Sequence, residues 1–441
     1  MSKIEEIDID TDEQYTSGST SSGGEYDDIY DEYKDEKLTT TIINQIELSK
    51  SVQDKHKQNG YDETLKSQKI IKFLKRSLEG VNSSHQALDS SKVWIAFWAL
   101  NGLDLLGNLD SMQDVSERTA SYFTVLQNSD GGFGGGNTHT SHSVSTFAAV
   151  SALFSVGTEQ VYNVINRETM YQYLLRMKTQ EGAFRTEIGG EVDSRSTYCA
   201  IAVASMLNIL TDELKSGVAE FLERCQTYEG GFGAYPGNEA HGGYTFCAVS
   251  ALAILNKLDI IDMESLHRWI TFRQTEDGGF QGRTNKLVDT CYSYWQGAVV
   301  VIIQSFYDYQ CHTDISGQQT PIDNGKLLFS QRSLQEYILI CCQDKAGGFG
   351  DHPVKGRDYY HTSYGLSGLS LSQHNDIYKI IKTMNNEQIE QAVPPITLQS
   401  DVFKFNDQGD VVEPTHPLYN IKITKLEKGL KYFHSLPFPP K

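Results

Sequence analysis

A short phrase built around Gly-Phe recurs five times between residues 127 and 350, and it constrains the fold more than any other feature. Its versions read QNSDGGFGG, KTQEGAFRT, QTYEGGFGA, QTEDGGFQG and CQDKAGGFG. Their phenylalanines are separated by 51, 48, 48 and 69 residues. An interval of this length has room for two helices and two turns, with an insertion before the last copy. The chain is therefore predicted to be a repeat of helical hairpins.

Two kinds of helix alternate with the phrase. The segments after it, such as SVSTFAAVSALFSV and YTFCAVSALAIL, are apolar on nearly all sides, which is typical of buried helices. The segments before it (YQYLLRMKTQ, VAEFLERCQT, SLHRWITFRQT and LQEYILICCQD) are amphipathic. The pattern predicts an all-α fold, an α/α barrel with an inner ring of apolar helices and an outer ring of amphipathic ones. An open solenoid of helical pairs is the alternative.

The N-terminal segment differs in composition from the rest of the chain. Residues 1–36 contain 13 acidic residues and two lysines, so they carry −11 of the total net charge of −19. Such a segment has too few apolar side chains to offset the entropy of ordering. We predict a disordered acidic tail over residues 1–38. Residues 39–441 are predicted to form the barrel domain, with a helical lead-in and a C-terminal extension.

Composition also excludes several classes of protein. The acidic excess argues against nucleic-acid binding, which needs a basic surface. No stretch approaches the roughly 20 apolar residues that span a bilayer, and the opening MSKIEEIDID lacks the features of a signal peptide. Seven cysteines, an odd number, make a poor disulfide framework. A cytoplasmic location is expected, with reduced cysteines and no transmembrane segment.

One set of residues has the chemistry of a metal site. Asp289 and Cys291 in LVDTCYSYWQ are two residues apart, about 200° on a regular helix, so they can face one ion only where an extended segment enters a helix. His361 in RDYYHTSYG opens another apolar helix. One Asp, one Cys and one His suit Zn²⁺ and leave its fourth position open. From these residues alone, a buried core cysteine is the competing interpretation.

Five long strings resemble the β subunits of protein prenyltransferases, most closely those of protein farnesyltransferases. They are GGEVDSRSTYCA, EAHGGYTFCAVSALAIL, FQGRTNKLVDTCYSYWQ, RDYYHTSYGLSGLS and PTHPLYNI, and the likeness runs from about Ser90 to Ile421. The resemblance implies transfer of farnesyl from farnesyl diphosphate to the cysteine of C-terminal CaaX proteins such as small GTPases. It also implies a heterodimer with a helical α subunit, and a catalytic zinc held by Asp289, Cys291 and His361.

The resemblance further implies a site for the diphosphate. Positive charge gathered at one mouth of an acidic barrel suits an anionic ligand. By the resemblance, a basic cluster with one tyrosine binds the diphosphate, Arg195 lines the farnesyl and peptide site, and Asp351 recruits Mg²⁺. Lys355 is either a further diphosphate residue or an ordinary solvated lysine. The diphosphate residues are His241, Arg283, Lys286 and Tyr292.

Aromatic residues are expected to form the pocket for the isoprenoid and the peptide. Trp94 and Trp98 lie four residues apart on one helix face, where core packing is the simpler interpretation. The resemblance places them at the far end of the barrel beside Tyr360, with Trp94 filling the space of a longer isoprenoid. Tyr198 and Trp295 are expected to join the same lining.

Three other functions compete with farnesyl transfer. The nearest is the type I geranylgeranyltransferase β subunit, which Trp94 and Asp351 disfavour, because that family carries a lysine at the position of Asp351. Terpene cyclases share the repeat architecture, but the DxDD motif of their proton donor is missing from this sequence. A helical-repeat scaffold without catalysis would not require the Asp, Cys and His set.

Overall fold

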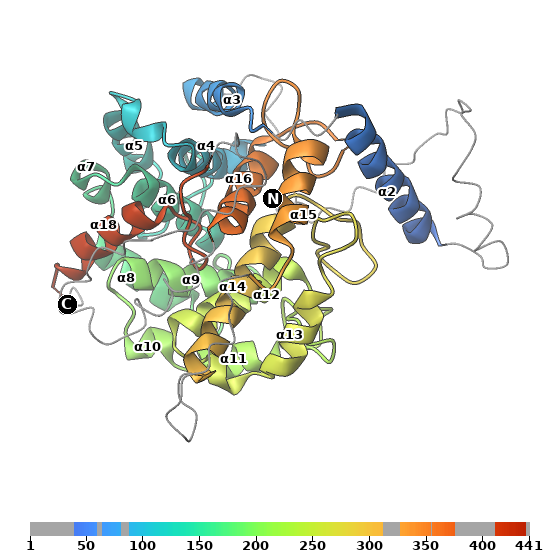
Figure 1. Ribbon diagram of the computed structural model, residues 1–441. Helices are drawn as coiled ribbons and strands as arrows, with labels where there is room; N and C mark the ends of the chain where they lie inside the picture. The colour runs from blue at the N-terminus through green and yellow to red at the C-terminus, as the bar shows by residue number, and fades with distance from the viewer. Residues whose placement is uncertain are drawn as a thin grey trace.

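Six helical hairpins form most of the molecule in the computed structural model, which describes residues 39–59, 64–80, 88–311, 327–353, 355–374 and 411–437 (Figure 1). In each hairpin an outer helix precedes an inner helix. The pairs are α3 (Ser67–Glu79) with α4 (Lys92–Leu105), α5 (Val115–Thr124) with α6 (Ser143–Val156), α8 (Arg167–Met177) with α9 (Ser194–Met206), α11 (Val218–Arg224) with α12 (Gly242–Ile254), α13 (Met263–Thr271) with α14 (Tyr292–Cys311), and α15 (Gln331–Glu336) with α16 (Tyr359–Gln373).

The inner helices close into a ring. Each packs against the next along the chain, and α16, the last, packs against α4, the first. Each outer helix packs on the inner helix of its own hairpin. The α/α barrel is therefore confirmed, and the open solenoid is wrong. The apolar character of the inner helices follows from this position, since every residue of α6 is buried.

The first hairpin is not marked in the sequence by the Gly-Phe phrase. The five phrases connect the outer and inner helices of the other hairpins, whereas α3 and α4 are joined without one. The repeats visible in the sequence therefore count one hairpin fewer than the fold contains.

Each phrase ties two hairpins together at the same end of the barrel. The phenylalanines are buried, and Phe133, Phe232 and Phe349 donate their backbone N–H to a threonine hydroxyl of the following inner helix at 2.9–3.0 Å. Backbone hydrogen bonds of 2.7–3.0 Å then link the first residues of the inner helices to the next hairpin. These interhairpin bonds are Val93 to Gly135, Ser143 to Thr186, Ser194 to Ala234, Gly242 to Gly282, and Thr290 to Asp351. We call this end, where the inner helices begin, the mouth.

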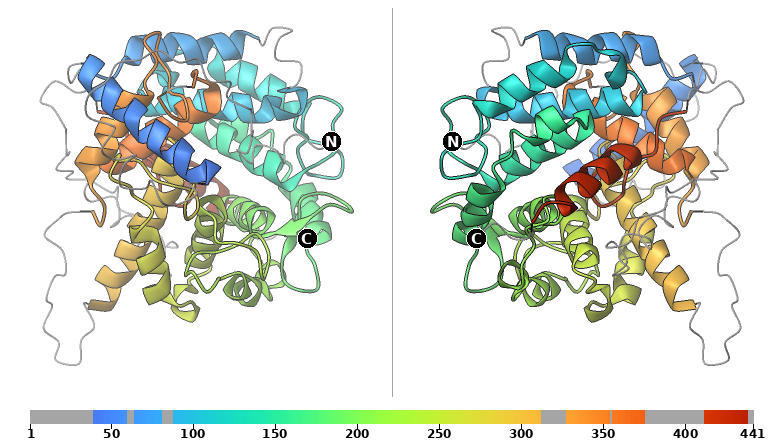
Figure 2. Two further views of the ribbon diagram at one scale, coloured as in Figure 1. Left: turned by 90° about the vertical axis from the view of Figure 1, so that its right-hand side faces the viewer. Right: turned by 90° about the vertical axis from the view of Figure 1, so that its left-hand side faces the viewer.

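The outer helix of the last hairpin departs from the predicted amphipathic pattern. After α15 the chain continues as a π-helix, η5 (Tyr337–Cys342), in which every residue is buried. The long helix α2 (Thr40–Asn59) covers it, with Leu48 and Val52 packed into the contact (Figure 2). The predicted amphipathic pattern is therefore wrong for Tyr337–Cys342, because α2 packs outside this segment.

The opposite end of the barrel is closed by the C-terminal segment. Helix α18 (Ile423–His434) packs across α6 and α9 (Figure 1). The turn before it caps the lumen, because Tyr198 donates its hydroxyl to the carbonyl oxygen of Leu418 at 2.6 Å and Tyr294 donates to that of Pro417 at 3.0 Å. The remaining short elements are η3 (Leu109–Ser111), α7 (Glu159–Tyr162), β1 (Phe184–Arg185) paired antiparallel with β2 (Val192–Asp193), α10 (Asp212–Lys215) and η4 (Leu258–Ile260).

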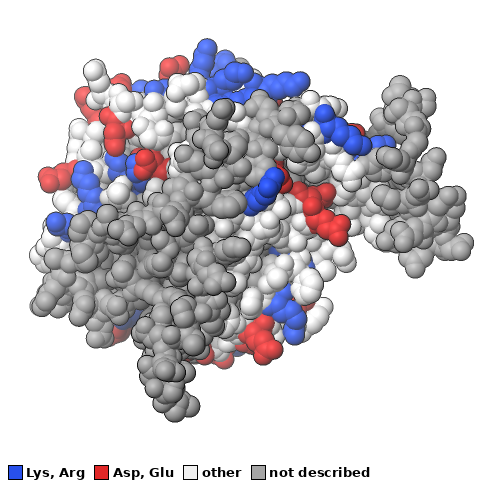
Figure 3. Space-filling model, in the orientation of Figure 1, with Lys and Arg blue, Asp and Glu red and all other residues white. Residues whose placement is uncertain are grey.

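The surface carries a band of basic side chains over α3. Lys69, Lys72 and Arg76 are exposed there, while Ile70 and Leu74 face the core (Figure 3). Among the helices that the structure describes, none is long and apolar enough to cross a bilayer. The predicted tail, residues 1–38, lies outside the described residues, so the domain boundary at residue 38 stays a prediction.

Candidate metal centre and substrate site

The residues that begin the inner helices recur at a fixed place in the repeat. His142, Asp193, His241 and Asp358 follow the phenylalanine of their phrase by nine residues, and each caps its helix through a side-chain acceptor. Asp289 occupies the same place in its own repeat and donates its N–H to the Phe280 carbonyl. Since the positive ends of the inner helices all face the mouth, this end of the barrel favours anionic ligands.

Asp289, Cys291 and His361 converge at the mouth. All three are buried, and one ligand atom from each lies within 4.8 Å of the others. Asp289 and Cys291 lie just before α14 begins, in non-helical backbone, and the carboxylate of Asp289 accepts the Cys291 N–H at 2.8 Å. His361 is the third residue of α16, and its Nε2 lies 3.3 Å from Asp289 Oδ1. The structure thus brings together the three predicted ligands.

The donor atoms of this cluster fit a divalent cation. Asp289 Oδ2 is buried without a hydrogen bond, and His361 Nε2 is buried with none beyond its 3.3 Å approach to Asp289 Oδ1. Buried polar atoms are rarely left with unused hydrogen-bonding capacity, so two such atoms beside a cysteine sulfur are well explained by a shared metal ion. The three donors offer one oxygen, one sulfur and one nitrogen, which is a set that binds zinc.

The local electrostatics also favour a cation. Burial raises the pKa of the Cys291 thiol, and the charge of Asp289 raises it further. Although burial opposes both shifts, the Asp289–His361 pairing lowers the pKa of the carboxyl group and raises that of the imidazole. A bound dication would replace the imidazole proton and stabilise the thiolate.

Tyr292 and His241 form a pair beside the candidate metal ligands. We call that set of ligands, Asp289, Cys291 and His361, the metal cluster. Tyr292 directly follows Cys291 in the chain, and its hydroxyl lies 3.1 Å from His241 Nε2. His241 accepts the N–H of Gly243 through Nδ1, so Nε2 is the nitrogen that carries hydrogen and donates. The tyrosine ring fits only because residue 282 is glycine, since a Cβ there would lie 2.1 Å from Tyr292 Cζ.

The basic residues predicted for the diphosphate lie on loops at the mouth. Arg283 and Lys286 belong to the turn that leads to Asp289, and Arg283 Nη1 contacts Glu239 Oε2 at 3.2 Å. Arg195 is the second residue of α9 and contacts Asp193 at 3.0 Å. Lys355 is exposed. These positions agree with the predicted end of the barrel, while the role of each residue stays a prediction.

Asp351 lies in the loop that leads to α16. Its backbone carbonyl accepts the N–H of Thr290 at 2.8 Å, and its carboxylate accepts the N–H of His352 at 2.7 Å. Burial raises the pKa of this carboxyl group. Because Thr290 separates Asp289 from Cys291, the structure connects Asp351 directly to the metal cluster.

The predicted pocket aromatics belong to a closed circuit of rings around the lumen. Consecutive ring centroids lie 4.9–6.4 Å apart at every step but one. At the remaining step Trp295 donates its Nε1–H to the Tyr360 hydroxyl at 3.2 Å. All six inner helices contribute to this circuit, so it lines the lumen from every side. In order the circuit is Trp94, Phe147, Tyr198, Phe246, Trp295, then Tyr360 through the Trp295 hydrogen bond, Trp98 and back to Trp94.

Trp98 lies beside Tyr360 as predicted, with ring centroids 5.4 Å apart, but the predicted far-end position is wrong for Trp94. Trp94 is the third residue of α4, in its first turn, and Tyr360 is adjacent to His361. Both therefore lie near the mouth. Trp94 is nevertheless distant from His241, which caps α12. Helices α4 and α12 lie on opposite sides of the ring of six inner helices, so Trp94 faces the lumen across from His241.

Sequence reasoning missed Asp358, Thr290, Phe147 and Phe246. Asp358 was recoverable, because it follows Phe349 by nine residues as His241 follows Phe232. Its carboxylate contacts the ring of His361, and this contact orients the candidate metal ligand. The two phenylalanines carried no distinguishing signal, since an aromatic residue on an apolar helix is ordinary in a core.

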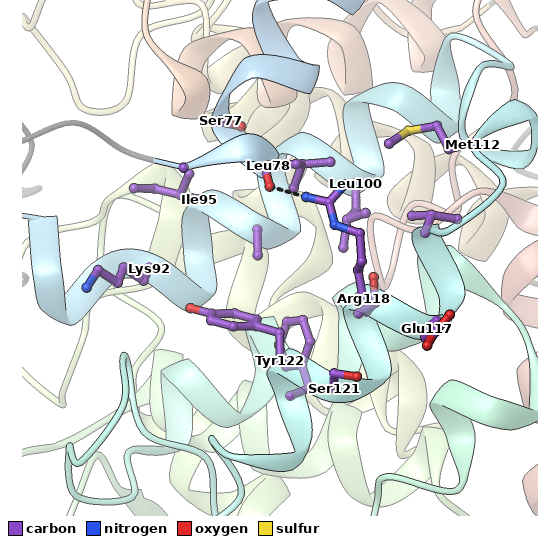
Figure 4. Close-up of a pocket in the computed structure, with 15 residues that line it drawn as sticks. Ser77, Leu78, Lys92, Ile95, Leu100, Met112, Glu117, Arg118, Ser121 and Tyr122 are labelled. Atoms are coloured by element: carbon purple, nitrogen blue, oxygen red, sulfur yellow. Dashed lines mark hydrogen bonds between the residues drawn. The ribbon is translucent and has the colours of Figure 1, made fainter.

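A separate cavity lies outside the ring. Its volume is about 650 Å³, and α3, α4 and α5 bound it. The guanidinium of Arg118 donates a hydrogen bond of 2.6 Å to the Leu78 carbonyl oxygen at this cavity (Figure 4). None of the predicted site residues lines it. This cavity is therefore separate from the candidate metal ligands at the mouth.

The comparisons with known proteins identify the class. The model of the prenyltransferase alpha-alpha toroid domain matches residues 65–421. A solved Candida albicans protein geranylgeranyltransferase-I, complexed with GGPP, superposes with a TM-score of 0.61 over 83% of this chain and 98% of that chain. At 22% identity it establishes the fold alone. The closed ring and the mouth described above are thus those of an α-α toroid prenyltransferase.

Closer relatives identify the group within that class. The chain is 52% identical to the protein farnesyltransferase subunit beta of Dictyostelium discoideum, over 98% of this chain and 94% of that protein. It is 35% identical to the corresponding subunit of Arabidopsis thaliana, over 83% and 82%. The chain belongs to the family of protein farnesyltransferase β subunits.

Proposed function

We propose that this chain is the catalytic β subunit of a protein farnesyltransferase, transferring farnesyl from farnesyl diphosphate to the cysteine of CaaX proteins. The observation that carries the proposal is the buried Asp289, Cys291 and His361 cluster at the rim of an aromatic lumen. A thiol acceptor needs a cation beside it, and a 15-carbon chain needs an apolar cavity. The cluster lies beside the aromatic rings here, because the Tyr360 and His361 rings are in contact.

The protein residues divide the work between the two substrates. Asp289, Cys291 and His361 would hold Zn²⁺, which when bound would lower the pKa of the substrate thiol, so that its proton is released and the sulfur reacts as a thiolate. His241, Arg283, Lys286 and Tyr292 would bind the diphosphate and stabilise the charge that develops on it as the C1–oxygen bond breaks. The aromatic circuit would orient the isoprenoid so that C1 faces the sulfur. The C–S bond forms, diphosphate leaves, and no covalent enzyme intermediate is required.

Two further components complete the proposal. Asp351 is proposed to bind Mg²⁺ at the diphosphate, which would neutralise part of the leaving-group charge. The relatives are named as β subunits, and we propose the α subunit that this name implies as the obligate partner, with CaaX proteins such as small GTPases as substrates. A cytoplasmic location is the setting in which these reduced thiols and substrates would meet.

The test is a prenylation assay on the reconstituted heterodimer. This chain would be co-expressed with candidate α subunits and assayed with farnesyl and geranylgeranyl diphosphates and a CaaX peptide, with zinc content measured on the same sample. We expect zinc to be retained and farnesyl to be transferred preferentially. Preferential geranylgeranyl transfer would instead establish the type I geranylgeranyltransferase alternative.

A further inference from the structure

Thr290 lies between the metal ligands Asp289 and Cys291 and binds the backbone that carries Asp351. Its N–H donates to the carbonyl oxygen of Asp351 at 2.8 Å. Its hydroxyl lies 2.7 Å from the carbonyl oxygen of Gly350 and 2.8 Å from that of Asp351, and the residue is completely buried. Since a hydroxyl has one hydrogen to donate, the two carbonyls share it. The Asp351 segment is thus held to the metal cluster by both the backbone and the side chain of one residue.

The same arrangement recurs at other junctions between hairpins. The hydroxyl of Ser143 donates to the carbonyl of Arg185 at 2.7 Å, and that of Ser194 to the carbonyl of Gly233 at 3.3 Å. At two other junctions the corresponding residues are Val93 and Gly242, whose side chains have no hydroxyl, and only the backbone hydrogen bond is made there. The barrel therefore closes without this hydroxyl at some junctions. The hydroxyl of Thr290 differs from the others in what it joins: one segment carries Asp289 and Cys291, and the other carries Asp351.

We propose that Thr290 is a positioning residue that fixes Asp351 relative to the Asp289–Cys291 pair. This inference rests on the proposed function, in which Asp351 binds Mg²⁺ at the diphosphate. The carbon that accepts the sulfur is attached to that diphosphate, so the distance from Asp351 to the zinc ligands sets how closely the two reactants approach. A clamp made of a backbone N–H and a hydroxyl on consecutive carbonyls restricts both the position and the rotation of the Asp351 peptide.

The experiment removes the hydroxyl and leaves the metal ligands unchanged. Thr290→Val preserves the volume of the side chain, Thr290→Ser preserves the hydroxyl, and Thr290→Ala removes the hydroxyl without a replacing methyl group, should valine prevent folding. Ser143→Ala is the matched control, because it removes the equivalent hydroxyl at a junction away from the metal cluster. All are assayed as heterodimers, for zinc content, for the Mg²⁺ concentration giving half-maximal stimulation, and for Mn²⁺ binding by paramagnetic resonance with a non-transferable farnesyl diphosphate analogue.

We expect Thr290→Val or Thr290→Ala to raise the half-maximal Mg²⁺ concentration and weaken Mn²⁺ binding about ten-fold, the usual scale for losing a residue that supports a metal ligand. Zinc content should stay at the wild-type level, and Thr290→Ser and Ser143→Ala should behave like the wild type. The inference is overturned if the hydroxyl-free variants keep wild-type Mg²⁺ and Mn²⁺ responses while Asp351→Ala loses them; the proposed function then stands. It is also overturned if Ser143→Ala shifts both responses equally. If Asp351→Ala itself keeps both responses, the proposed role of Asp351 has failed, and the inference fails with it.

Discussion

Asp358 holds the His361 ring in the orientation that a metal ligand requires. One carboxylate oxygen accepts the His361 backbone N–H at 2.7 Å, and the other lies 2.6 Å from ring Nδ1. The carboxylate thus caps α16 and also orients the side chain of His361, the third residue of that helix. With Nδ1 as the donor to Asp358, Nε2 is the nitrogen left to face Asp289 and Cys291.

Replacing Asp358 should weaken zinc binding without abolishing it. Asp358→Ala removes the acceptor for Nδ1–H and the helix cap, while the three ligands remain. Zinc affinity of the heterodimer should fall about 10- to 100-fold. Competition with a chelator of known affinity measures the change, and Asp358→Asn, which keeps an acceptor at the cap, should fall between the alanine variant and the wild type. Unchanged affinity in both variants would mean that Asp358 serves the helix alone.

Replacing Cys291 should have a more severe effect. Cys291→Ala removes one of three protein ligands and the only soft one, so zinc retention and turnover should both be lost. Helical content should be preserved, because the sulfur lies at the start of α14 and the apolar face of the helix is unaltered. Metal analysis and circular dichroism of the purified heterodimer test this, and a fully active, zinc-free variant would refute the metal assignment.

Replacing Asp351 should distinguish the contribution of Mg²⁺ from that of Zn²⁺. Asp351→Ala should lose Mg²⁺ stimulation while still binding farnesyl diphosphate, because His241, Arg283 and Lys286 remain. Rates measured across a Mg²⁺ titration, with diphosphate binding measured separately, provide the test. A titration curve identical to the wild type would remove Asp351 from the site.

Removing the acidic N-terminal segment should leave catalysis unchanged. The segment precedes α2, and none of the proposed site residues lies within it. A chain beginning at residue 39 should therefore form the heterodimer and turn over at the wild-type rate. Heterodimer yield and kcat are the measurements, and a large fall in either would show that residues 1–38 contribute to the fold or to assembly.

Trp94 is expected to set the length of the isoprenoid. A rigid indole can exclude an additional five-carbon unit more strongly than a pocket can detect a missing one. Trp94→Thr should shift the ratio of kcat/KM for geranylgeranyl over farnesyl diphosphate upward, with zinc and CaaX recognition retained. Loss of the ring should lower the free energy of unfolding by about 3–5 kcal/mol if the surrounding side chains do not relax into the space.

The control for this experiment is already present in the aromatic circuit. Phe147 lies 6.4 Å from Trp94 between centroids and is buried on the neighbouring helix. Phe147→Leu should lower kcat/KM for both farnesyl and geranylgeranyl diphosphate without raising the ratio in favour of geranylgeranyl. If Trp94→Thr folds and its ratio matches that of the wild type, Trp94 is core packing, and farnesyl specificity has to be explained by other residues.

The sequence by itself determined the elements and the chemistry of the site. The helical hairpins follow from the Gly-Phe period and from the contrast between apolar and amphipathic segments, since local periodicity reports which face of a helix is buried. The ligand set followed from Asp289, Cys291 and His361 as residue types, together with a family resemblance. Asp358 could have been added by the nine-residue spacing alone.

Only the tertiary structure decided how these pieces meet. Ring closure depends on contacts between α4 and α16, which are more than 250 residues apart in the chain, and no local pattern encodes such a contact. The burial of Tyr337–Cys342 is decided by α2 packing outside it, and the clamp of Thr290 on Gly350 and Asp351 by the meeting of two hairpins. Side-chain chemistry is written in each residue, whereas its partners and its solvent exposure are set by segments distant in sequence.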